Sequence, residues 1–318
     1  MKVVFEERLR ALVAEPEALE AVELAFGALA RGRVIQPPPL GMDLDEARGE
    51  VHVKGAFLKG EDVFAMKVAS GFYGNAAQGL PTGSGLVLVF DAKTGFPLAL
   101  LQDNGYLTEL RTGAAGALAV RLLAPTRPLT AAVIGTGSQA RFQMRAIARV
   151  RELRQVRAWS PVSEELETYC REMTAALGVP VNGVESPKAA VERADLVVTV
   201  TPSRTPILEA GWLSSGVTVV AVGSDGPEKQ ELSVEILGGA GKVVVDSREQ
   251  CIRLGETHHA VKAGVLSGEA IHAELGDVLL GVRPGREGEE TIVADLTGVG
   301  AQDAAMAGMV WRMLEEES

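Results

Sequence analysis

The sequence predicts an α/β protein with a central parallel sheet, and three observations support this fold class. Strand-like apolar runs recur at residues 130–134, 155–159, 196–200, 218–222 and 242–245, with helix-compatible segments between most of them. The first of these runs ends in a glycine-rich turn. Hydrophobic residues make up 47% of the 318 residues and are spread evenly, so the chain is long enough for two domains with sizeable cores.

The N-terminal region predicts a helix followed by a sheet. Pro16 suits the first turn of a helix, and apolar residues recur on one face up to about Arg31. The triple proline at 37–39 ends regular structure, and Asp91–Gly95 is a hairpin turn signal. The segments that alternate or run apolar are 51–57, 63–68, 86–90 and 97–101. This region therefore predicts a mostly antiparallel sheet.

Two further helices complete the predicted elements. An alanine- and glycine-rich helix is predicted from Thr108, as its N-cap, to Ala124. Its small side chains indicate close packing against another helix or a cofactor. Pro125 and Pro128 mark the linker into the parallel-sheet region, and a last helix is predicted at 301–317.

The glycine-rich turn has the pattern G-x-G-x-x-A at a strand-to-helix junction. Gly135 permits a tight turn, and Gly137 has no Cβ to keep a pyrophosphate from the backbone. Ala140 lets the helix pack close to the strand, while the helix N-terminus offers free N–H groups to phosphates. Because strands and helices alternate after it, the turn predicts a Rossmann dinucleotide-binding domain rather than an ordinary glycine turn.

The choice of dinucleotide stays open in the sequence. An acidic residue about 20 positions beyond the glycines would bind the ribose 2′-hydroxyl of NAD. The second strand instead ends at Ser160, and the next carboxylate is Glu164. A neutral Ser160 permits the 2′-phosphate of NADP, but no arginine follows to bind it. The predicted cofactor is therefore NAD or NADP.

Composition excludes several other classes. A net charge of −11 argues against nucleic-acid binding, which needs a basic surface. No apolar stretch approaches the roughly 20 residues of a membrane span, and the N-terminus lacks a signal-peptide pattern, so we expect a cytoplasmic protein with no membrane partner. Cys170 and Cys251 are expected to be reduced thiols. The pair His258-His259 lacks a ligand cluster, so no metal site is expected.

With these motifs in hand, the chain resembles the ornithine cyclodeaminase/mu-crystallin family over nearly its full length. The segments that carry the resemblance are Gly79–Pro81, Asp91–Gly95, Leu107–Thr112, Val133–Gln139, Thr199–Thr201, Val222–Asp225, Lys229–Leu232, Asp295–Gly298 and Gln302-Asp303. The resemblance implies a split α+β domain (residues 1–124 and 300–318) that binds substrate and forms a homodimer. It also implies a central NAD(P)-binding Rossmann domain (residues 125–299).

The resemblance also implies a chemistry. Family members transfer hydride between the Cα of an amino acid and nicotinamide, which gives an α-imine. In cyclodeaminases a side-chain amine attacks the imine, ammonia leaves and the hydride returns. In dehydrogenase relatives water attacks instead, or the enzyme runs backwards as an imine reductase.

Two basic residues are candidates for substrate binding. Lys67 is a lone cation in an apolar strand, which favours burial with a partner. The family pattern places it on the substrate carboxylate, and we count it as catalytic as well. Arg111 lies in the first turns of a helix, where a cation opposes the dipole, so an anion is expected beside it. A surface ion pair with Glu109 or Asp103 is the alternative for Arg111.

Asp225 is the predicted general acid/base. It follows a strand, and open α/β sheets build their sites at the carboxyl ends of strands. An ordinary turn carboxylate is the alternative. Lys229 is expected to pair with Asp225 or the cofactor, or to be solvated, and Gly298 is expected to contact substrate near the nicotinamide. The predicted cofactor-binding residues are Thr112, Gly135, Thr136, Gly137, Ser138, Gln139, Ser160, Thr199, Thr201, Val222 and Lys229.

The chain departs from the ornithine pattern at two places. Ornithine-type members tend to carry an arginine after the early proline cluster, where this chain has Pro39-Leu40. They also carry a carboxylate on the next strand, where alignment places His52, with Lys54 on the same side of the strand. His52 and Lys54 are therefore predicted to bind substrate, and an acidic substrate suits them better than ornithine.

These departures resemble the ectoine-utilisation cyclodeaminase-like and iminosuccinate reductase branch of the family. We therefore expect an NAD(P)-dependent amino-acid dehydrogenase or imine reductase. Two alternatives stay open: an ornithine cyclodeaminase that makes L-proline and ammonia, and a non-catalytic NADP-dependent binding protein of the mu-crystallin type. The joint presence of Lys67, Arg111 and Asp225 disfavours the second.

Overall fold

The computed structural model describes residues 1–317 and divides them into two compact units. The first unit consists of residues 1–111 and 299–317, and the second of residues 112–298. The division falls within the helix α3 (Tyr106–Leu123), whereas the sequence placed it after that helix, at residue 124. The final helix belongs to the first unit, so its chain is split. Across the described residues, no helix has the length and apolar character needed to span a membrane.

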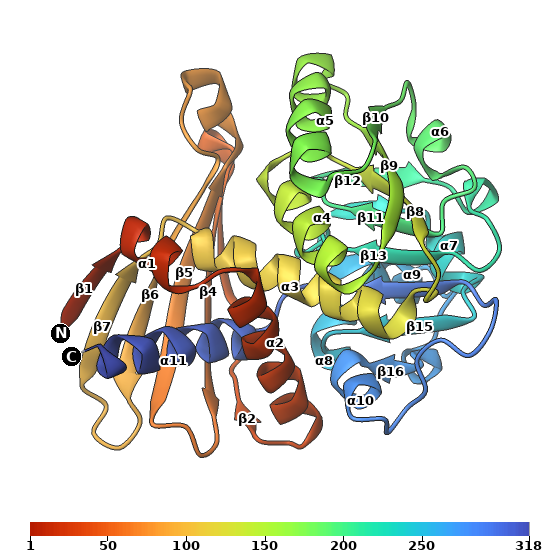
Figure 1. Cartoon of the computed structure of the whole chain (residues 1–318). Coiled ribbons are helices and arrows are strands. Elements are labelled where there is room, and N and C mark those ends of the chain that lie inside the picture. The colour runs from red at the N-terminus through yellow and green to blue at the C-terminus, as the bar shows by residue number, and fades with distance from the viewer. Residues whose placement is uncertain (318) are drawn as a thin grey trace. The chain divides into compact units, whose positions relative to one another are not determined.

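A seven-stranded mixed sheet forms the centre of the first unit (Figure 1). The order is β1-β7-β6-β5-β4-β2, with β3 also paired to β4, and only the β1–β7 pair is parallel. The strands are β1 (Lys2–Phe5), β2 (Val34–Ile35), β3 (Leu40–Leu44), β4 (Gly49–Leu58), β5 (Val63–Phe72), β6 (Gly83–Asp91) and β7 (Pro97–Gln102). The predicted, mostly antiparallel sheet is confirmed.

Helices cover one face of this sheet. Figure 1 shows α11 (Gly300–Glu316), in blue, lying across strands from the other end of the chain, and α11 contacts β4, β5 and α2 (Glu15–Ala30). The two chain ends meet here, since Lys2 Nζ donates to the Leu314 carbonyl at 3.1 Å. The short elements are α1 (Glu6–Leu12), η1 (Asp45–Ala47) and η2 (Tyr73–Gln78). Alternate strand residues such as Ala65, Lys67 and Val87 are buried on this face.

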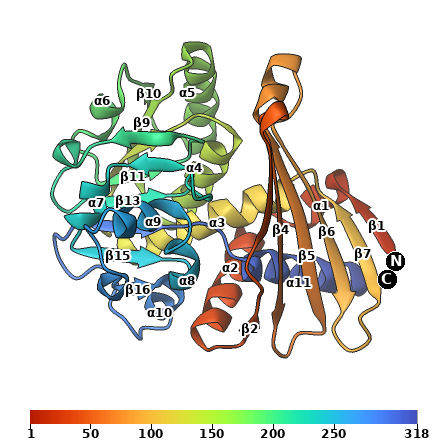
Figure 2. The same ribbon diagram turned by 180° about the vertical axis from the view of Figure 1, so that it is seen from behind.

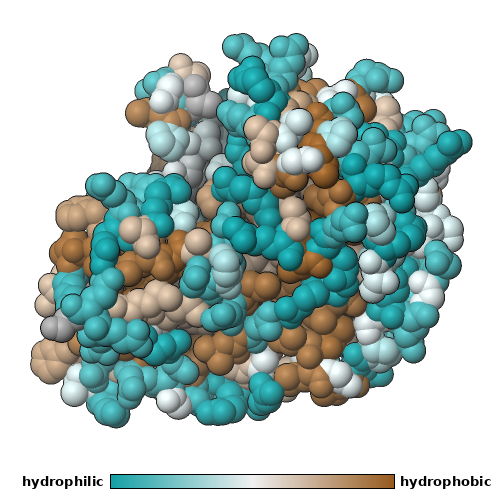
Figure 3. Space-filling view, viewed as in Figure 1, coloured by the Kyte–Doolittle hydropathy of each residue, from teal (hydrophilic) through white to brown (hydrophobic). Residues whose placement is uncertain are grey.

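The opposite face of the sheet is also apolar. Register places Val53, Val68 and Leu86 on it, together with Met66 and Leu88, which lie opposite each other. Met66 is 40% exposed, and Phe64 and Phe90 stack with ring centroids 4.9 Å apart. Figure 3 shows brown, apolar side chains at the surface of this unit near the sheet edge that carries β1. The sheet therefore has hydrophobic surface that its own helices do not cover.

An eight-stranded parallel sheet forms the centre of the second unit. Its order is β10-β9-β8-β11-β13-β17-β15-β16, and Figure 2 shows most of these strands lying in sequence across the unit. The strands are β8 (Leu129–Ile134), β9 (Leu153–Trp159), β10 (Val181–Gly183), β11 (Leu196–Thr199), β13 (Thr218–Ala221), β15 (Lys242–Val245), β16 (Ala273–Glu274) and β17 (Ile292–Asp295). The predicted Rossmann-like fold is confirmed. The chain turns back between β8 and β11, the place where such sheets bind ligands.

Helices and a two-stranded sheet complete this unit. The small sheet pairs β12 (Arg204–Leu208) with β14 (Gln230–Leu232). The helices are α4 (Ser138–Val150), α5 (Ser163–Leu177), α6 (Pro187–Val191), η3 (Ala210–Trp212), α7 (Val234–Gly238), α8 (Arg248–Cys251), α9 (Gly255–Lys262), η4 (Gly268–Ala270) and α10 (Leu275–Leu279). A continuous apolar core includes Ile134, Val197, Val219 and Val293.

One predicted helix boundary is wrong. α3 begins at Tyr106, so Thr108 lies inside its first turn and is not the N-cap. The first-turn amide of Leu107 donates instead to Asp103 Oδ2 at 2.8 Å. Asp103 thus provides the capping oxygen from a position just before the turn, which satisfies an otherwise unpaired helix amide.

Candidate active site

The glycine turn lies between β8 and α4. Gly135 has φ = +104°, and a Cβ there would stand 2.9 Å from the Val200 carbonyl oxygen, so both conformation and packing require glycine. Gly137 has φ = −72°, and a Cβ on it would meet no protein atom within 4 Å. Ala140 is fully buried, as its predicted packing role requires.

This turn fits the pyrophosphate of a dinucleotide. Gly137, as N-cap of α4, provides no side-chain cap, and Ser138 is exposed, so the first helix amides are open to a ligand. Thr136 Oγ1 is buried and has no hydrogen-bond partner among the described residues. A buried hydroxyl without a partner is costly, and a phosphate oxygen would satisfy it.

Other side chains stabilise the turn from behind. Arg141 Nη1 donates to the carbonyl oxygens of Thr136 and Gly137, and its Nε donates to Glu172 at 2.9 Å. Gln143 Nε2 donates to Gln139 Oε1 at 3.1 Å and to the Thr112 carbonyl at 2.8 Å. Ser160 directly follows β9, and its hydroxyl accepts from the Val162 amide at 3.3 Å.

The loop that follows the carboxyl end of β13 carries the predicted acid/base group, Asp225. Asp225 Oδ1 lies 2.7 Å from Lys229 Nζ, so the structure shows one of the alternatives considered for Lys229, the pairing with Asp225. Lys229 is 8% exposed, whereas the Asp225 side chain is 37% exposed. The geometry is that of a solvent-accessible carboxylate held by a largely buried cation.

A carboxylate that the sequence analysis did not name as a site residue joins two loops here. Glu231 accepts from Thr199 Oγ1 at 2.7 Å, from the Thr201 amide at 2.6 Å and from the Gly223 amide at 2.9 Å. Thr199 is fully buried, so its hydroxyl serves Glu231, and Val222 precedes the second loop. The signal available in the sequence was Glu231 itself, a charge beside the apolar Leu232.

The backbone of Gly298 is held by a buried hydrogen-bond network. Its amide donates to Asp246 Oδ2 at 2.6 Å, and its carbonyl accepts from Gln250 Nε2 at 2.9 Å. The fully buried Cys251 thiol lies 3.2 Å from Asp246 Oδ1. His259 Nε2 contacts the Lys229 carbonyl at 2.8 Å. His259 therefore contacts a backbone carbonyl, and the Cys251 thiol contacts a carboxylate.

The first unit contains a buried cluster of cations. Lys67 Nζ lies 2.9 Å from Asp303 Oδ1, and Arg111 Nε lies 3.0 Å from the same oxygen. Lys54 lies directly opposite Lys67 on the neighbouring strand, and the three cations are 3–7% exposed. Gln302 Oε1 accepts from Arg111 Nη1 at 3.3 Å. The anion expected beside Arg111 is thus, in this structure, the Asp303 carboxylate.

Charge in this cluster is positive. Burial is the largest influence on Lys67 and, with the nearby Arg111, it lowers the pKa of the Lys67 ammonium to about 7. Burial alone would raise the pKa of Asp303, but Lys67 and Arg111 outweigh it and lower that pKa. Burial raises the pKa of Asp103, which also lies within the electrostatic reach of Lys67. Even with Asp103 counted, the three cations outnumber the carboxylates.

His52 lies on the same strand face as Lys54, as predicted, but the structure adds a carboxylate to that face. Glu50 precedes His52 by two residues, and its Oε2 lies 3.7 Å from His52 Nε2. Glu50 Oε1 accepts from the Tyr73 hydroxyl at 2.6 Å. No local sequence pattern marks Glu50, because its partner Tyr73 lies on a different element.

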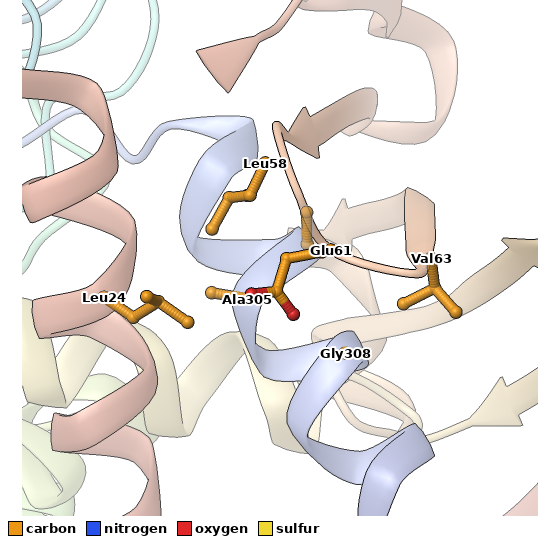
Figure 4. A pocket seen from close by; sticks show the side chains of 7 residues that line it. Leu24, Leu58, Glu61, Val63, Ala305 and Gly308 are labelled. Atoms are coloured by element: carbon orange, nitrogen blue, oxygen red, sulfur yellow. The ribbon is translucent and has the colours of Figure 1, made fainter. Parts of the chain in front are cut away.

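A small hollow in the first unit does not coincide with these groups. Figure 4 shows Leu24, Leu58, Val63 and the α11 residues around it, with Glu61 as its acidic member. Arg312 Nη1 lies 2.6 Å from Glu61 Oε2. With mainly apolar walls and a paired carboxylate, this hollow has no group suited to acid/base or cofactor chemistry.

Sequence comparison assigns this arrangement to a family. A model of the ornithine cyclodeaminase/mu-crystallin family matches residues 3–318. The chain belongs to this family. Its similarity to named amino-acid and imino-acid oxidoreductases shows that it is an enzyme of the family.

Three relatives match nearly the whole chain. A Rhizobium meliloti protein classed as a dehydrogenase by name alone is 45% identical, over 98% of this chain and 95% of its own length. An uncharacterized cyclodeaminase of Sinorhizobium fredii is 41% identical, over 100% of this chain and 97% of its own length. An alanine dehydrogenase of Archaeoglobus fulgidus is 37% identical, over 97% of this chain and 94% of its own length. The relatives therefore include both reaction types considered above.

Solved structures agree with this assignment. A Thermococcus litoralis Δ1-pyrroline-2-carboxylate reductase in complex with NADH and L-proline has a TM-score of 0.95 and 31% identity, covering 100% of this chain and 98% of its own. An archaeal alanine dehydrogenase dimer with bound NAD has a TM-score of 0.92 and 35% identity, covering 100% and 97%. The iminosuccinate reductase of Paracoccus denitrificans in complex with NAD+ has a TM-score of 0.90 and 32% identity, covering 100% and 97%.

Proposed function

We propose that this enzyme is an NAD(P)-dependent amino-acid dehydrogenase or imine reductase that acts at the Cα of a small amino or imino acid. The observation that carries the proposal is the excess of buried cations at Lys54, Lys67 and Arg111, which suits the carboxylate that every such substrate has. The open glycine turn supports a dinucleotide, and the three solved relatives contain NADH, NAD or NAD+.

The residue roles follow from charge and exposure. Nicotinamide, when bound, supplies or accepts the hydride. Lys67 and Arg111 bind the substrate carboxylate, and Asp225, exposed and held by Lys229, takes or returns the proton on the substrate nitrogen or on water.

Substrate charge is set by Lys54. Its side chain is 7% exposed on the face that carries Lys67, so an acidic side chain of the substrate would gain a charge-assisted hydrogen bond worth about 1.5–3 kcal/mol. We expect Lys54→Glu to shift kcat/KM from acidic toward basic substrates. Steady-state kinetics with L-aspartate, L-alanine and L-ornithine would measure the shift. An unchanged order of preference would exclude Lys54 from substrate selection.

The lowered pKa of Lys67 gives a pH dependence. Its ammonium form binds an anionic substrate, and this form declines above about pH 7 in the free enzyme because burial and Arg111 disfavour it. We expect kcat/KM for imine reduction to fall as pH rises above about 7. Lys67→Arg, which keeps its charge at all these pH values, should lose this descending limb. The same limb in both enzymes would assign it to another group.

One experiment tests the reaction itself. The protein is incubated with NADH or NADPH and either an oxo acid plus ammonia (pyruvate or oxaloacetate) or the cyclic imino acid Δ1-pyrroline-2-carboxylate without ammonia. Nicotinamide absorbance is followed. We expect oxidation of the cofactor with at least one of these acids. A protein that binds cofactor but turns over none of them in either direction would instead be a binding protein of the mu-crystallin type.

A cyclodeaminase is the second candidate, and Glu50 is the observation that favours it. This carboxylate lies on the substrate-facing side of β4 and could receive a side-chain amine. The test is conversion of L-ornithine to L-proline with release of ammonia and no net change in nicotinamide absorbance. Faster turnover of ornithine than of any acidic or neutral substrate would make this second function the correct one.

The enzyme is proposed to act as a homodimer in the cytoplasm. The apolar outer face of the first sheet, with Met66 at 40% exposure, offers a surface for a second copy, and the archaeal alanine dehydrogenase is a dimer. Free cysteines at 170 and 251 suit a reducing compartment. The branch of ectoine-utilisation cyclodeaminase-like proteins and iminosuccinate reductases is the proposed subfamily, based on His52 and Lys54. Light scattering on the pure protein would measure its mass in solution and so distinguish the proposed homodimer from a monomer.

A further inference from the structure

We propose that Glu231 is a positioning residue that holds together the two loops carrying the cofactor-contacting and proton-transferring groups. The proposal rests on the function proposed above. The first loop follows β11 and contains Thr201, and the second follows β13 and contains Gly223 and Asp225. Glu231 lies in one of the segments that carry the family resemblance, Lys229–Leu232, and its side chain is fully buried, so it acts through the loops rather than on a ligand.

The contacts show how one side chain controls both loops. Glu231 Oε1 accepts from the Thr201 amide at 2.6 Å, while Oε2 accepts from the Gly223 amide at 2.9 Å and from Thr199 Oγ1 at 2.7 Å. Both carboxylate oxygens therefore accept from backbone amides of different loops. Only an ionised carboxylate presents two acceptor oxygens in this way.

The close approach of the loops is an independent observation. A Cβ on Gly223 would overlap the Thr201 carbonyl oxygen and would lie 2.6 Å from Glu231 Oε2. Glycine at 223 therefore lets the second loop reach both Thr201 and the Glu231 carboxylate. The loop that begins here contains Asp225 two residues later, so a shift at Gly223 would move the proposed acid/base group.

Two more buried carboxylates hold Glu231 in place. Glu256, on α9, accepts from the amides of Glu231 at 2.7 Å and Leu232 at 3.1 Å. Asp295, at the end of β17, accepts from the Thr257 amide at 2.8 Å and so anchors α9 in turn. These contacts connect the sheet to α9, α9 to β14, and β14 to the two loops.

Placing carboxylates here has an electrostatic cost, which argues for a function. Burial is the main cause that raises the pKa of Glu231 to about 7 and that of Asp295 to about 7. Burial and the charge of Glu231 raise the pKa of Glu256 well above its usual value. An apolar residue at 231 would avoid this cost but would leave two loop amides without acceptors.

The variant Glu231→Gln separates positioning from packing. Glutamine has the same shape, but one of its two acceptors becomes an NH2 donor, which must face the Thr201 amide or the Gly223 amide. One loop is therefore released whichever way the amide is oriented. We expect kcat to fall at least about tenfold, because a displacement of about 1 Å in an active site costs up to ~100-fold.

Binding and exchange measurements test the mechanism without turnover. Under the proposed function the nicotinamide of NADH contacts these loops. Released loops should then weaken binding of NADH and leave the affinity for ADP-ribose, which lacks nicotinamide, within about twofold of the unmodified protein. In the protein without cofactor, hydrogen–deuterium exchange should speed up in peptides containing residues 199–203 and 222–226, and not in those of β8 and α4.

Matched variants complete the design. Glu228→Gln makes the same charge change at an exposed position three residues away and should leave all readouts unchanged. Gly223→Ala keeps the carboxylate at 231 but introduces a Cβ 2.6 Å from Glu231 Oε2, so it should push the second loop away and reproduce the kinetic and binding effects. If Glu231→Gln fails to fold, Gly223→Ala carries the test. Where both variants fold, the double variant should lose less kcat, in free-energy terms, than the sum of the two single losses, because both substitutions break the same contact between Glu231 and Gly223.

The outcomes distinguish this proposal from the function on which it rests. The proposal would be overturned if Glu231→Gln left kcat and the ratio of NADH affinity to ADP-ribose affinity unchanged. Equal weakening of the binding of both ligands would overturn it too. An unmodified protein that binds neither NADH nor NADPH would overturn the proposed function instead.

Discussion

Replacing Gly137 with valine is expected to abolish NAD(P) binding while the fold stays intact. A Cβ at this position meets no protein atom within 4 Å, and the backbone φ of −72° suits any residue, so the folded protein tolerates the change. The added side chain would instead fill the space that a pyrophosphate needs beside the first amides of α4. Fluorescence titration with NADH and NADPH measures the loss, and thermal unfolding checks the fold.

Two other glycines serve as controls for this experiment. Gly211 also has open space for a Cβ and no positive φ, so Gly211→Val should preserve cofactor affinity. Gly135→Ala should destabilise the protein, because φ is +104° and the Val200 carbonyl is only 2.9 Å from the new Cβ. Unchanged cofactor affinity in Gly137→Val would remove the cofactor assignment from this turn.

Replacing Asp225 with asparagine is expected to lower kcat by about 10²–10⁴, the usual contribution of a positioned acid/base group. Asparagine keeps an oxygen for Lys229, which lies 2.7 Å from the carboxylate, but it cannot accept a proton. Cofactor affinity should change little, because the glycine turn is unaltered. Stopped-flow measurement of hydride transfer, beside cofactor titration, separates the two properties.

The control for Asp225 is an exposed aspartate that lies far from it in the sequence. Asp62 is 86% exposed and pairs with Lys93, so Asp62→Asn should retain full activity. A loss of less than tenfold in Asp225→Asn would make Asp225 an ordinary turn residue. The proton-transferring group would then have to be sought elsewhere, with Lys67 and its pKa of about 7 as the next candidate.

Local sequence patterns were sufficient for most of the second unit. The strand ending at Ile134, the turn at Gly135 and Gly137 and the helix from Ser138 are encoded within about 20 consecutive residues, so they could be predicted from the sequence. β17 was missed because a four-residue apolar segment carries little signal alone. Its position between β13 and β15 depends on pairing with strands that lie far away in the sequence.

The contacts within the candidate site could be predicted from the sequence only in part. Lys67 and Arg111 stood out because a charge in an apolar strand and a cation near a helix start conflict with local rules. Their partner Asp303 could not be identified, because it lies 236 residues beyond Lys67 and 192 beyond Arg111. Thr199 was expected to line the cofactor, whereas its hydroxyl is buried against Glu231.

The sequence by itself determined the class of fold, the glycine turn and the types of charged residue available for chemistry. Periodicity, glycine spacing and helix-end preferences act between near neighbours in the chain, so they can be recognised from the sequence alone. Only the tertiary structure decided which charges meet: Asp303 with Lys67, Glu50 with Tyr73, and Glu231 with the amides of two loops. The physical reason is that a buried charge is stabilised by whichever partner the folded chain brings within hydrogen-bond distance, and that choice depends on the path of the whole chain.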